Sequence, residues 1–258
     1  MIRFALLYPT PDAAEDDFID LTARCTPGGR VVPVYFPWPE GAEDLTALST
    51  EQTYNAVREL GSEAHLTRVI PSLSDFDVAI FAVTSASFLH GTRGVERQLD
   101  TLRRLTGLPS ISTTSAFQHA VRHLGLSRVA LASVYHPTAS DHFIDRLAEA
   151  GAITVGRVDA DASSDRELAT WTTDRIVSLV KAAVNDGAQA VLLPETALHT
   201  ATIGDVLDEA AGRPVLTATQ VTVWSAYRAV GQQPFADNAG ALFAEQTRPA
   251  RAGSDPSA

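Results

Sequence analysis

The chain has 258 residues, of which 45% are hydrophobic and 20% are charged, and its formal net charge is −11. This size fits one large domain or two smaller lobes. The negative charge argues against nucleic acid and anionic membrane surfaces as main partners, and no apolar run approaches the length of a membrane span. The single cysteine, Cys25, excludes an internal disulfide. Because the chain starts with an expected strand and not a signal peptide, we expect a cytoplasmic protein.

Strands and helices are predicted to alternate along the chain. The predicted strands cover 2–8, 30–36, 77–84, 128–135, 152–158 and 188–194, and the predicted helices cover 50–66, 94–105, 115–125, 140–151 and 164–187. Several of the strands are apolar throughout, which is typical of strands covered on both faces. The alternation predicts an α/β fold in which parallel sheets are flanked by helices.

An internal repeat divides this α/β chain. The segments that begin at Gly107 and at Gly212 both contain Gly-x-Pro, a short strand, a Thr-rich turn and a helix. The stretch from Val78 matches the stretch from Gln189 in the same way. We therefore predict two pseudo-symmetric lobes with a ligand-binding cleft between them. The first lobe would comprise 1–112 plus 216–240 and the second 113–215, and a disordered tail would follow at 245–258.

Polar side chains follow the matching strands on both sides of the predicted cleft. Thr84, Ser85 and Ser87 come at the end of one strand, and Glu195 and Thr196 come at the end of its counterpart. The hydroxyls could simply cap the next helix. They could also bind a carboxylate or phosphate, because free N–H groups at a helix N-terminus attract anions. The two interpretations are compatible.

Glu195 and several histidines are candidate proton carriers. A carboxylate in a half-buried cleft can have a raised pKa and act as a general acid or base, whereas a Glu exposed at a strand–loop junction would do neither. His90 and His199 follow the paired strand ends and would lie at the mouth of the cleft. His119 and His123 are four residues apart on a helix, but no third ligand with a signature spacing accompanies them, so no metal site is predicted.

Motifs that bind nucleotide cofactors are absent from the sequence. The chain has no P-loop and no Gly-x-Gly-x-x-Gly after a strand, and it lacks the Gly-x-Ser-x-Gly elbow of serine hydrolases. A Schiff-base mechanism would have to use the single lysine, Lys181, which falls in a predicted helix. The sequence therefore predicts no cofactor.

Several stretches together carry a family resemblance. They are STEQTYNAV from Ser49, VTSASFLHG from Val83, GLPSISTTSA from Gly107, RVALASVYHPTASDHFIDRL from Arg128 and RPVLTATQVTVWSA from Arg213. Their order and spacing resemble the aspartate/glutamate racemase superfamily, most closely its arylmalonate decarboxylase and maleate isomerase branch. The resemblance implies two pseudo-symmetric α/β lobes and a cofactor-independent enzyme that acts at the carbon next to a carboxylate.

The resemblance also implies which residues hold the substrate. Neutral donors would stabilise the carboxylate as it becomes an enediolate, without a lysine or a metal. The substrate-binding residues expected on this basis are Tyr54, Thr84, Ser85, Tyr135, Thr196 and Pro9.

The expected acid/base group departs from the family pattern. Family members carry one or two cysteines at the paired strand ends, and those positions fall here on Val83 and Pro194. The residue Cys25 lies far from both in the sequence and is expected to be a packing residue. We therefore expect a site that lacks cysteine, with Glu195 as the leading catalytic candidate and His90 and His199 behind it.

Three functions remain open from the sequence. The first is an enzyme that acts on a small mono- or dicarboxylic acid by decarboxylation, cis–trans isomerisation or epimerisation. The second is a catalytically degenerate carboxylate-binding protein on the same scaffold. The third is a lyase or hydratase that uses Tyr135 and His136 as its acid/base pair. In each case the partner is a small carboxylate, and the oligomeric state is left open, a homo-oligomer included.

Overall fold

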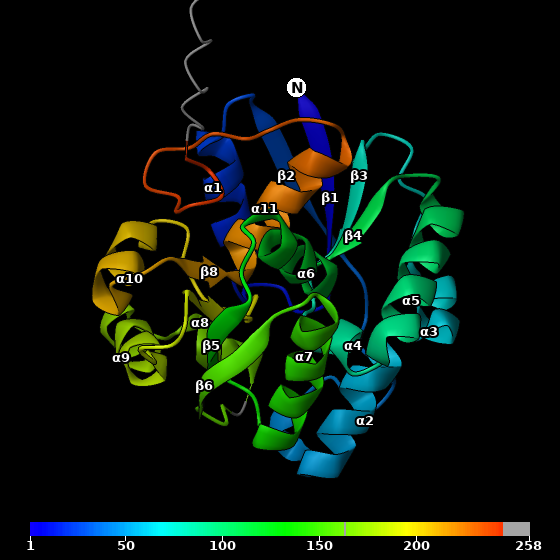
Figure 1. Cartoon of the computed structure of the whole chain (residues 1–258). Helices are drawn as coiled ribbons and strands as arrows, with labels where there is room; N and C mark the ends of the chain where they lie inside the picture. Colours follow the sequence, from blue (N-terminus) through cyan, green and yellow to red (C-terminus); the bar gives the residue numbers. More distant parts are fainter. Residues whose placement is uncertain (163, 245–258) are drawn as a thin grey trace, which may run out of the picture.

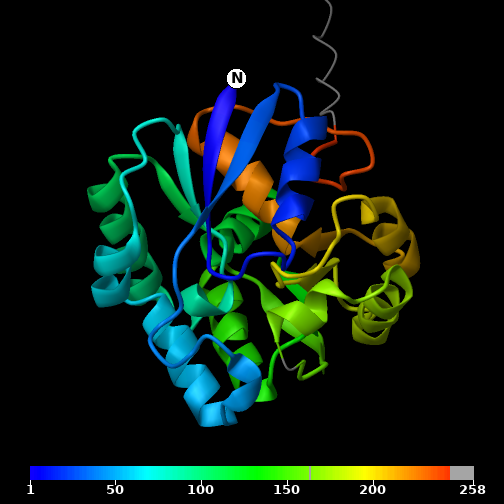
Figure 2. The same cartoon turned by 180° about the vertical axis from the view of Figure 1, so that it is seen from behind.

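The computed structural model places two parallel sheets at opposite ends of the molecule, with helices around and between them (Figures 1 and 2). The structure describes residues 1–162 and 164–244. The tail predicted at 245–258 lies outside the described residues. Each sheet has four strands in the described part of the chain, and the predicted α/β class with two matching lobes is confirmed.

The first sheet has the strand order β2-β1-β3-β4. Its strands are β1 (Ile2–Tyr8), β2 (Gly29–Tyr35), β3 (Val78–Phe81) and β4 (Ser110–Ser112). All pairings within it are parallel. The central strand β3 is fully buried, as its unbroken apolar sequence predicts.

The second sheet repeats this arrangement with the order β6-β5-β7-β8. Its strands are β5 (Arg128–Ser133), β6 (Ile153–Asp159), β7 (Ala190–Leu193) and β8 (Val215–Thr217). Its pairings are again parallel, and β7 occupies the place that β3 has in the first sheet. The carboxyl ends of β3 and β7 therefore approach each other between the lobes, where ligands bind in open α/β sheets.

Helices connect the strands. They are α1 (Glu15–Arg24), α2 (Thr50–Leu60), α3 (Glu63–Val69), α4 (Ser85–Phe88), α5 (Gly91–Thr106), α6 (Thr113–His123), α7 (Pro137–Glu149), α8 (Asp165–Ala169), α9 (Thr173–Ala183), α10 (Gly204–Ala211) and α11 (Ala218–Ala229), with a 3-10 turn at Leu45–Ala47. None of the helices in the described ranges is long and apolar enough to cross a membrane.

Two of the predicted helices are each divided in two by new N-caps. The helix predicted at 50–66 ends at Gly61, and the Ser62 hydroxyl then accepts a hydrogen bond from the His65 backbone to begin α3. The helix predicted at 164–187 stops at Thr170, and Thr172 caps α9. In both places a hydroxyl residue satisfies the free N–H groups of a fresh helix start, which periodicity alone does not predict.

The helices α6 and α11 pack against each other at the centre of the molecule (Figure 1). The hydroxyl of Thr222 on α11 donates a hydrogen bond of 2.9 Å to the hydroxyl of Thr113 on α6. The helix α11 also lies against the first sheet, where the rings of Phe4 and Tyr227 meet edge to face with 4.9 Å between their centroids. Nearly the whole of α11 and most of α6 are buried at the centre of the molecule.

The sheet registers define which residues of the two lobes are equivalent. Phe81 pairs with Ser112, the N-cap of α6, and Leu193 pairs with Thr217, the N-cap of α11. Phe81 is thus equivalent to Leu193. Val83 lies two residues after Phe81 and Glu195 lies two residues after Leu193, so these two residues are equivalent as well. The pairing of Val83 with Pro194 expected from sequence is therefore wrong by one residue, because the apolar strands could be aligned in more than one way.

Candidate active site

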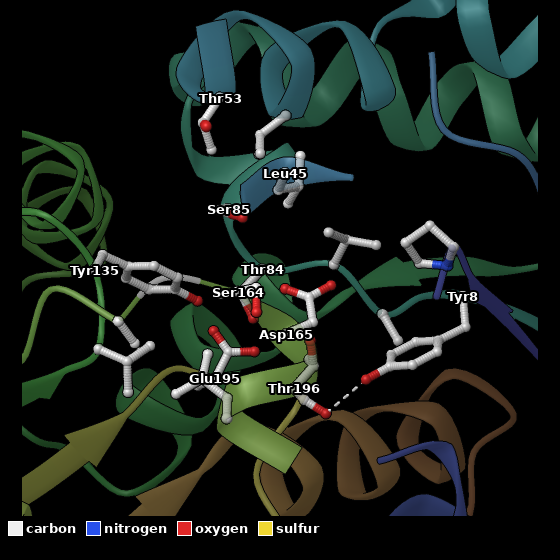
Figure 3. A pocket seen from close by; sticks show the side chains of 17 residues that line it. Tyr8, Leu45, Thr53, Thr84, Ser85, Tyr135, Ser164, Asp165, Glu195 and Thr196 are labelled. Carbon is white, nitrogen blue, oxygen red and sulfur yellow. Dashed lines mark hydrogen bonds between the residues drawn. The ribbon is translucent and has the colours of Figure 1, made fainter. Parts of the chain in front are cut away.

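A cavity of about 110 Å³ lies where the carboxyl ends of β3 and β7 face each other (Figure 3). Residues from both lobes line it. Among them are the predicted Pro9, Thr84, Ser85, Tyr135, Glu195 and Thr196, together with Tyr8, Val83, Ser164 and Asp165. The structure thus brings six of the predicted site residues together in one cavity.

The first lobe contributes a hydroxyl corner at the end of β3. Thr84 precedes α4 and Ser85 is its first residue. The backbone carbonyl of Thr84 accepts a hydrogen bond of 2.9 Å from the Thr114 hydroxyl, which fixes this turn. The side chain of Thr84 is buried, and its Oγ1 has no hydrogen-bond partner among the described residues. A buried hydroxyl left without a partner at a cavity is available to a ligand.

The second lobe contributes Glu195, two residues after β7. Its side chain is only 6% exposed, and its Oε1 accepts a hydrogen bond of 2.7 Å from the backbone N–H of Ala197. Burial raises the pKa of Glu195 to about 7, and the negative charge of Asp165 contributes to the increase, against the opposing effect of the Ala197 hydrogen bond. A carboxyl group with a pKa near neutrality can both accept and donate a proton at physiological pH.

Asp165 is a second carboxyl group in the cavity, and no sequence pattern marked it as a candidate. It is the first residue of α8 and lines the cavity together with Glu195 (Figure 3). Burial raises its pKa, while a 3.1 Å hydrogen bond from the Thr10 hydroxyl opposes the increase. In sequence Asp165 resembles an ordinary first-turn acid after the N-cap Ser164. Only its place after a strand end, like that of Glu195, could have indicated a site.

Two tyrosines flank the carboxyl pair as neutral donors. The Tyr8 hydroxyl donates to the backbone carbonyl of Thr196 at 2.9 Å, and the Tyr135 hydroxyl donates to the backbone carbonyl of Pro194. Burial raises the pKa of both phenols well above their usual value, and nearby carboxylates add to the effect. Both side chains therefore remain protonated at neutral pH, and each donates its single hydroxyl proton to a backbone carbonyl of the loop that carries Glu195.

Four residues that the sequence hypotheses placed in the site do not line the cavity. Tyr54 on α2 is hydrogen-bonded at 3.3 Å to His142 on α7. His90 precedes α5 and is largely buried, and its Nε2 has no partner in the described part of the chain. His199 is partly exposed, and its Nε2 lies 2.9 Å from Asp16 on the protein surface. His136, the partner of Tyr135 in the third hypothesis, is an exposed N-cap of α7. Sequence position alone could not show on which side of a helix or loop these side chains lie.

The single cysteine lies outside the cavity. Cys25 follows α1, is 4% exposed, and its Sγ lies 3.3 Å from the carbonyl oxygen of Leu21. Burial raises the pKa of its thiol to about 11, so it is not a thiolate nucleophile at neutral pH. Within 1–162 and 164–244, no group of three His, Cys, Asp or Glu side chains is placed to hold a metal ion.

Two matching parallel sheets with a polar cavity between them define a two-lobed α/β protein with its candidate site at the lobe interface. The sequence model of the arylmalonate decarboxylase family matches residues 47–243, and the chain belongs to this family.

Two characterised relatives are enzymes. The arylmalonate decarboxylase of Bordetella bronchiseptica is 27% identical over 150 residues, which is 57% of this chain. That match spans 62% of the decarboxylase, less than two thirds of its length. The maleate isomerase of Geobacillus stearothermophilus is 23% identical over 198 residues, which is 74% of this chain and 78% of the isomerase.

Solved structures agree with this fold. A liganded double mutant of arylmalonate decarboxylase is 25% identical, with a TM-score of 0.75 over 94% of this chain and 99% of its own. A maleate isomerase from Pseudomonas putida has a TM-score of 0.73 at 16% identity, over 94% of this chain and 98% of its own. Because this identity is low, the similarity to the maleate isomerase structure concerns the fold alone.

The raised pKa of Glu195 predicts a pH-dependent stability difference between the wild-type protein and a Glu195→Gln variant. In the unfolded chain this group ionises near its usual pKa of 4.5, whereas in the fold it ionises near 7. Raising the pH through this window therefore destabilises the folded wild type, by up to about 3 kcal/mol. Glutamine keeps an oxygen for Ala197 and has no charge to bury.

Chemical denaturation at pH 5 and at pH 8 measures this effect. We expect the stability of Glu195→Gln relative to the wild type to be higher at pH 8 than at pH 5. The same stability difference at pH 5 and at pH 8 would show that the pKa of Glu195 is the same in the folded and the unfolded chain.

Proposed function

We propose that this protein is a cofactor-independent enzyme that acts at the carbon next to the carboxylate of a small carboxylic acid, with Glu195 as the proton carrier. One observation carries the proposal: a buried carboxyl group with a pKa of about 7 shares a cavity with the hydroxyl groups of Thr84 and Ser85. The membership of the arylmalonate decarboxylase family supports it.

The donors of the first lobe would hold the substrate carboxylate. The Oγ1 of Thr84 has no protein partner among the described residues, and Ser85 lines the cavity beside it. As the bond at the neighbouring carbon breaks, its electron pair moves into the carboxylate and forms an enediolate. Neutral donors in a site that excludes water stabilise that developing charge, which lowers the barrier.

Glu195 would handle the proton on the opposite side of the substrate. In its ionised form it can remove the proton at the carbon next to the carboxylate, and return of a proton to the opposite face from a second donor completes an epimerisation. In its protonated form it can supply the proton that replaces CO₂ after a decarboxylation. Glu195 is equivalent to Val83 across the pseudo-twofold axis, and it provides a titrating group at a paired strand end, where the resemblance implies a family cysteine.

Deuterium exchange tests this proposal for every reaction that passes through an enediolate. The protein is incubated in D₂O with a panel of small mono- and dicarboxylic acids, and the hydrogen at the neighbouring carbon is followed by proton NMR. We expect catalysed loss of that signal, or formation of an isomer or a decarboxylated product, for at least one acid. Binding detected by thermal shift without any change in the NMR spectrum would favour the catalytically degenerate carboxylate-binding protein instead. Neither binding nor turnover would contradict both functions.

A further inference from the structure

Asp165 adds a second acidic side chain to the cavity, and its negative charge would repel a substrate with two carboxylates. In the described chain, the only charged side chains that line the cavity are Asp165 and Glu195, and no Lys, Arg or His lines it. The charge that these side chains can bring to the cavity is therefore negative. A substrate with two carboxylates would place its second negative charge against these groups without a cation to compensate, which is unfavourable in a site of low dielectric constant.

A relay of hydrogen bonds fixes the position of Asp165. The indole N–H of Trp38 donates to Thr10 Oγ1 at 3.1 Å, so the Thr10 hydroxyl proton is directed elsewhere. That hydroxyl donates to Oδ2 of Asp165, also at 3.1 Å. The backbone N–H of Asp165 itself adds a local hydrogen bond to the same carboxylate. The relay joins the two lobes and leaves the carboxylate lone pairs with which to accept from a ligand.

The cavity also contains hydroxyl groups that can bind a carboxylate. The Thr84 side chain is 1% exposed, lines the same cavity and has no hydrogen-bond partner for Oγ1 among the described residues. This unpartnered hydroxyl can donate to one carboxylate of a ligand, and Ser85 lies beside it (Figure 3). The cavity therefore offers hydroxyl donors for a single carboxylate and a fixed carboxylate acceptor for a second group.

We propose that Asp165 is a specificity-determining residue that accepts a hydrogen bond from an ammonium or hydroxyl group next to the substrate carboxylate, and that it excludes a second carboxylate. This inference rests on the proposed function and narrows its substrate class to amino or hydroxy monocarboxylic acids. Asp165 would bind the ammonium or hydroxyl substituent, and Thr84 and Ser85 would bind the carboxylate. Glu195 would transfer the proton.

A matched series on one three-carbon skeleton tests this inference. Alanine, lactate and propionate differ only in carrying an ammonium, a hydroxyl or no polar group on the carbon next to the carboxylate, and malonate has a second carboxylate in place of their methyl group. Their dissociation constants are measured by ligand-observed NMR with the wild type, Asp165→Asn and Asp161→Asn. Asp161 is an exposed acid on the same segment that does not line the cavity, so its variant controls for the loss of one negative charge.

We expect the wild type to bind alanine or lactate about tenfold more tightly than propionate, since a hydrogen bond to a charged group contributes at least that much, and to bind malonate most weakly. Asp165→Asn should remove most of this preference and improve malonate binding, whereas Asp161→Asn should leave the order unchanged. Malonate or propionate binding to the wild type as tightly as alanine and lactate would overturn the inference and leave the proposed function standing. Binding of none of the four acids would contradict the carboxylate site itself.

Discussion

Replacing Glu195 by glutamine is expected to reduce turnover about 100-fold or more, the range typical of a lost general acid/base, while binding of the substrate carboxylate changes little. Glutamine has nearly the same shape and can still accept the hydrogen bond from the Ala197 backbone N–H. It cannot take up or release a proton. Because the carboxylate donors Thr84 and Ser85 belong to the other lobe, they are untouched by the change. Rates and dissociation constants are measured on the acid that the wild type turns over.

A matched variant separates catalysis from the general effect of removing a carboxylate. Glu209 lies exposed on α10 and does not line the cavity, so Glu209→Gln removes the same group from the surface. It should keep full turnover. Full turnover in Glu195→Gln as well would remove Glu195 from the mechanism, even if the variant had a different pH dependence of stability.

Replacing Asp17 by alanine is expected to destabilise the protein by about 3 kcal/mol, because it leaves several buried donors without an acceptor. Asp17 lies on α1 of the first lobe and is 4% exposed. Its carboxylate accepts from the backbone N–H of Thr200 at 3.0 Å and of Ala201 at 2.7 Å, and from the Thr219 hydroxyl at 2.6 Å. These bonds hold the loop that carries Glu195 against the first lobe.

The neighbouring Asp16 provides the control. It lies on the same helix, its side chain is 68% exposed, and it pairs with His199 at the surface. Exposed pairs of this kind contribute little, so Asp16→Ala should change the unfolding free energy by less than about 1 kcal/mol. Urea denaturation of both variants gives the comparison. Equal stability of Asp17→Ala and Asp16→Ala would show that the bonds across the lobes at Asp17 do not stabilise the fold.

The fold could be predicted because its signals are local and repeated. Apolar runs such as the one from Val78 and the one from Gln189 end in polar corners at matching positions. Strands of this kind are buried on both faces, and their carboxyl ends meet at one edge of a sheet. The same reasoning placed Thr84 and Glu195 in a single cavity, although the strand register shifted their pairing by one residue.

The remaining parts of the site depend on long-range packing that a sequence pattern does not contain. Asp165 lines the cavity at the start of α8, where the Thr10 hydroxyl of the other lobe donates a hydrogen bond to it. Tyr54 is hydrogen-bonded to His142 on another helix and does not line the cavity. His199 forms its ion pair across the surface with Asp16. Each outcome is set by a partner more than 80 residues away in the chain.

The pH dependence of deuterium exchange into the substrate tests the role of Glu195 most directly. If Glu195 removes the proton, the exchange rate must rise with pH through the pKa of about 7 that burial gives this carboxyl group, and must level off above it. The rise should vanish in Glu195→Gln. A rate that does not vary between pH 5 and pH 8, or the same profile in the glutamine variant, would contradict the assignment of Glu195 as the proton carrier.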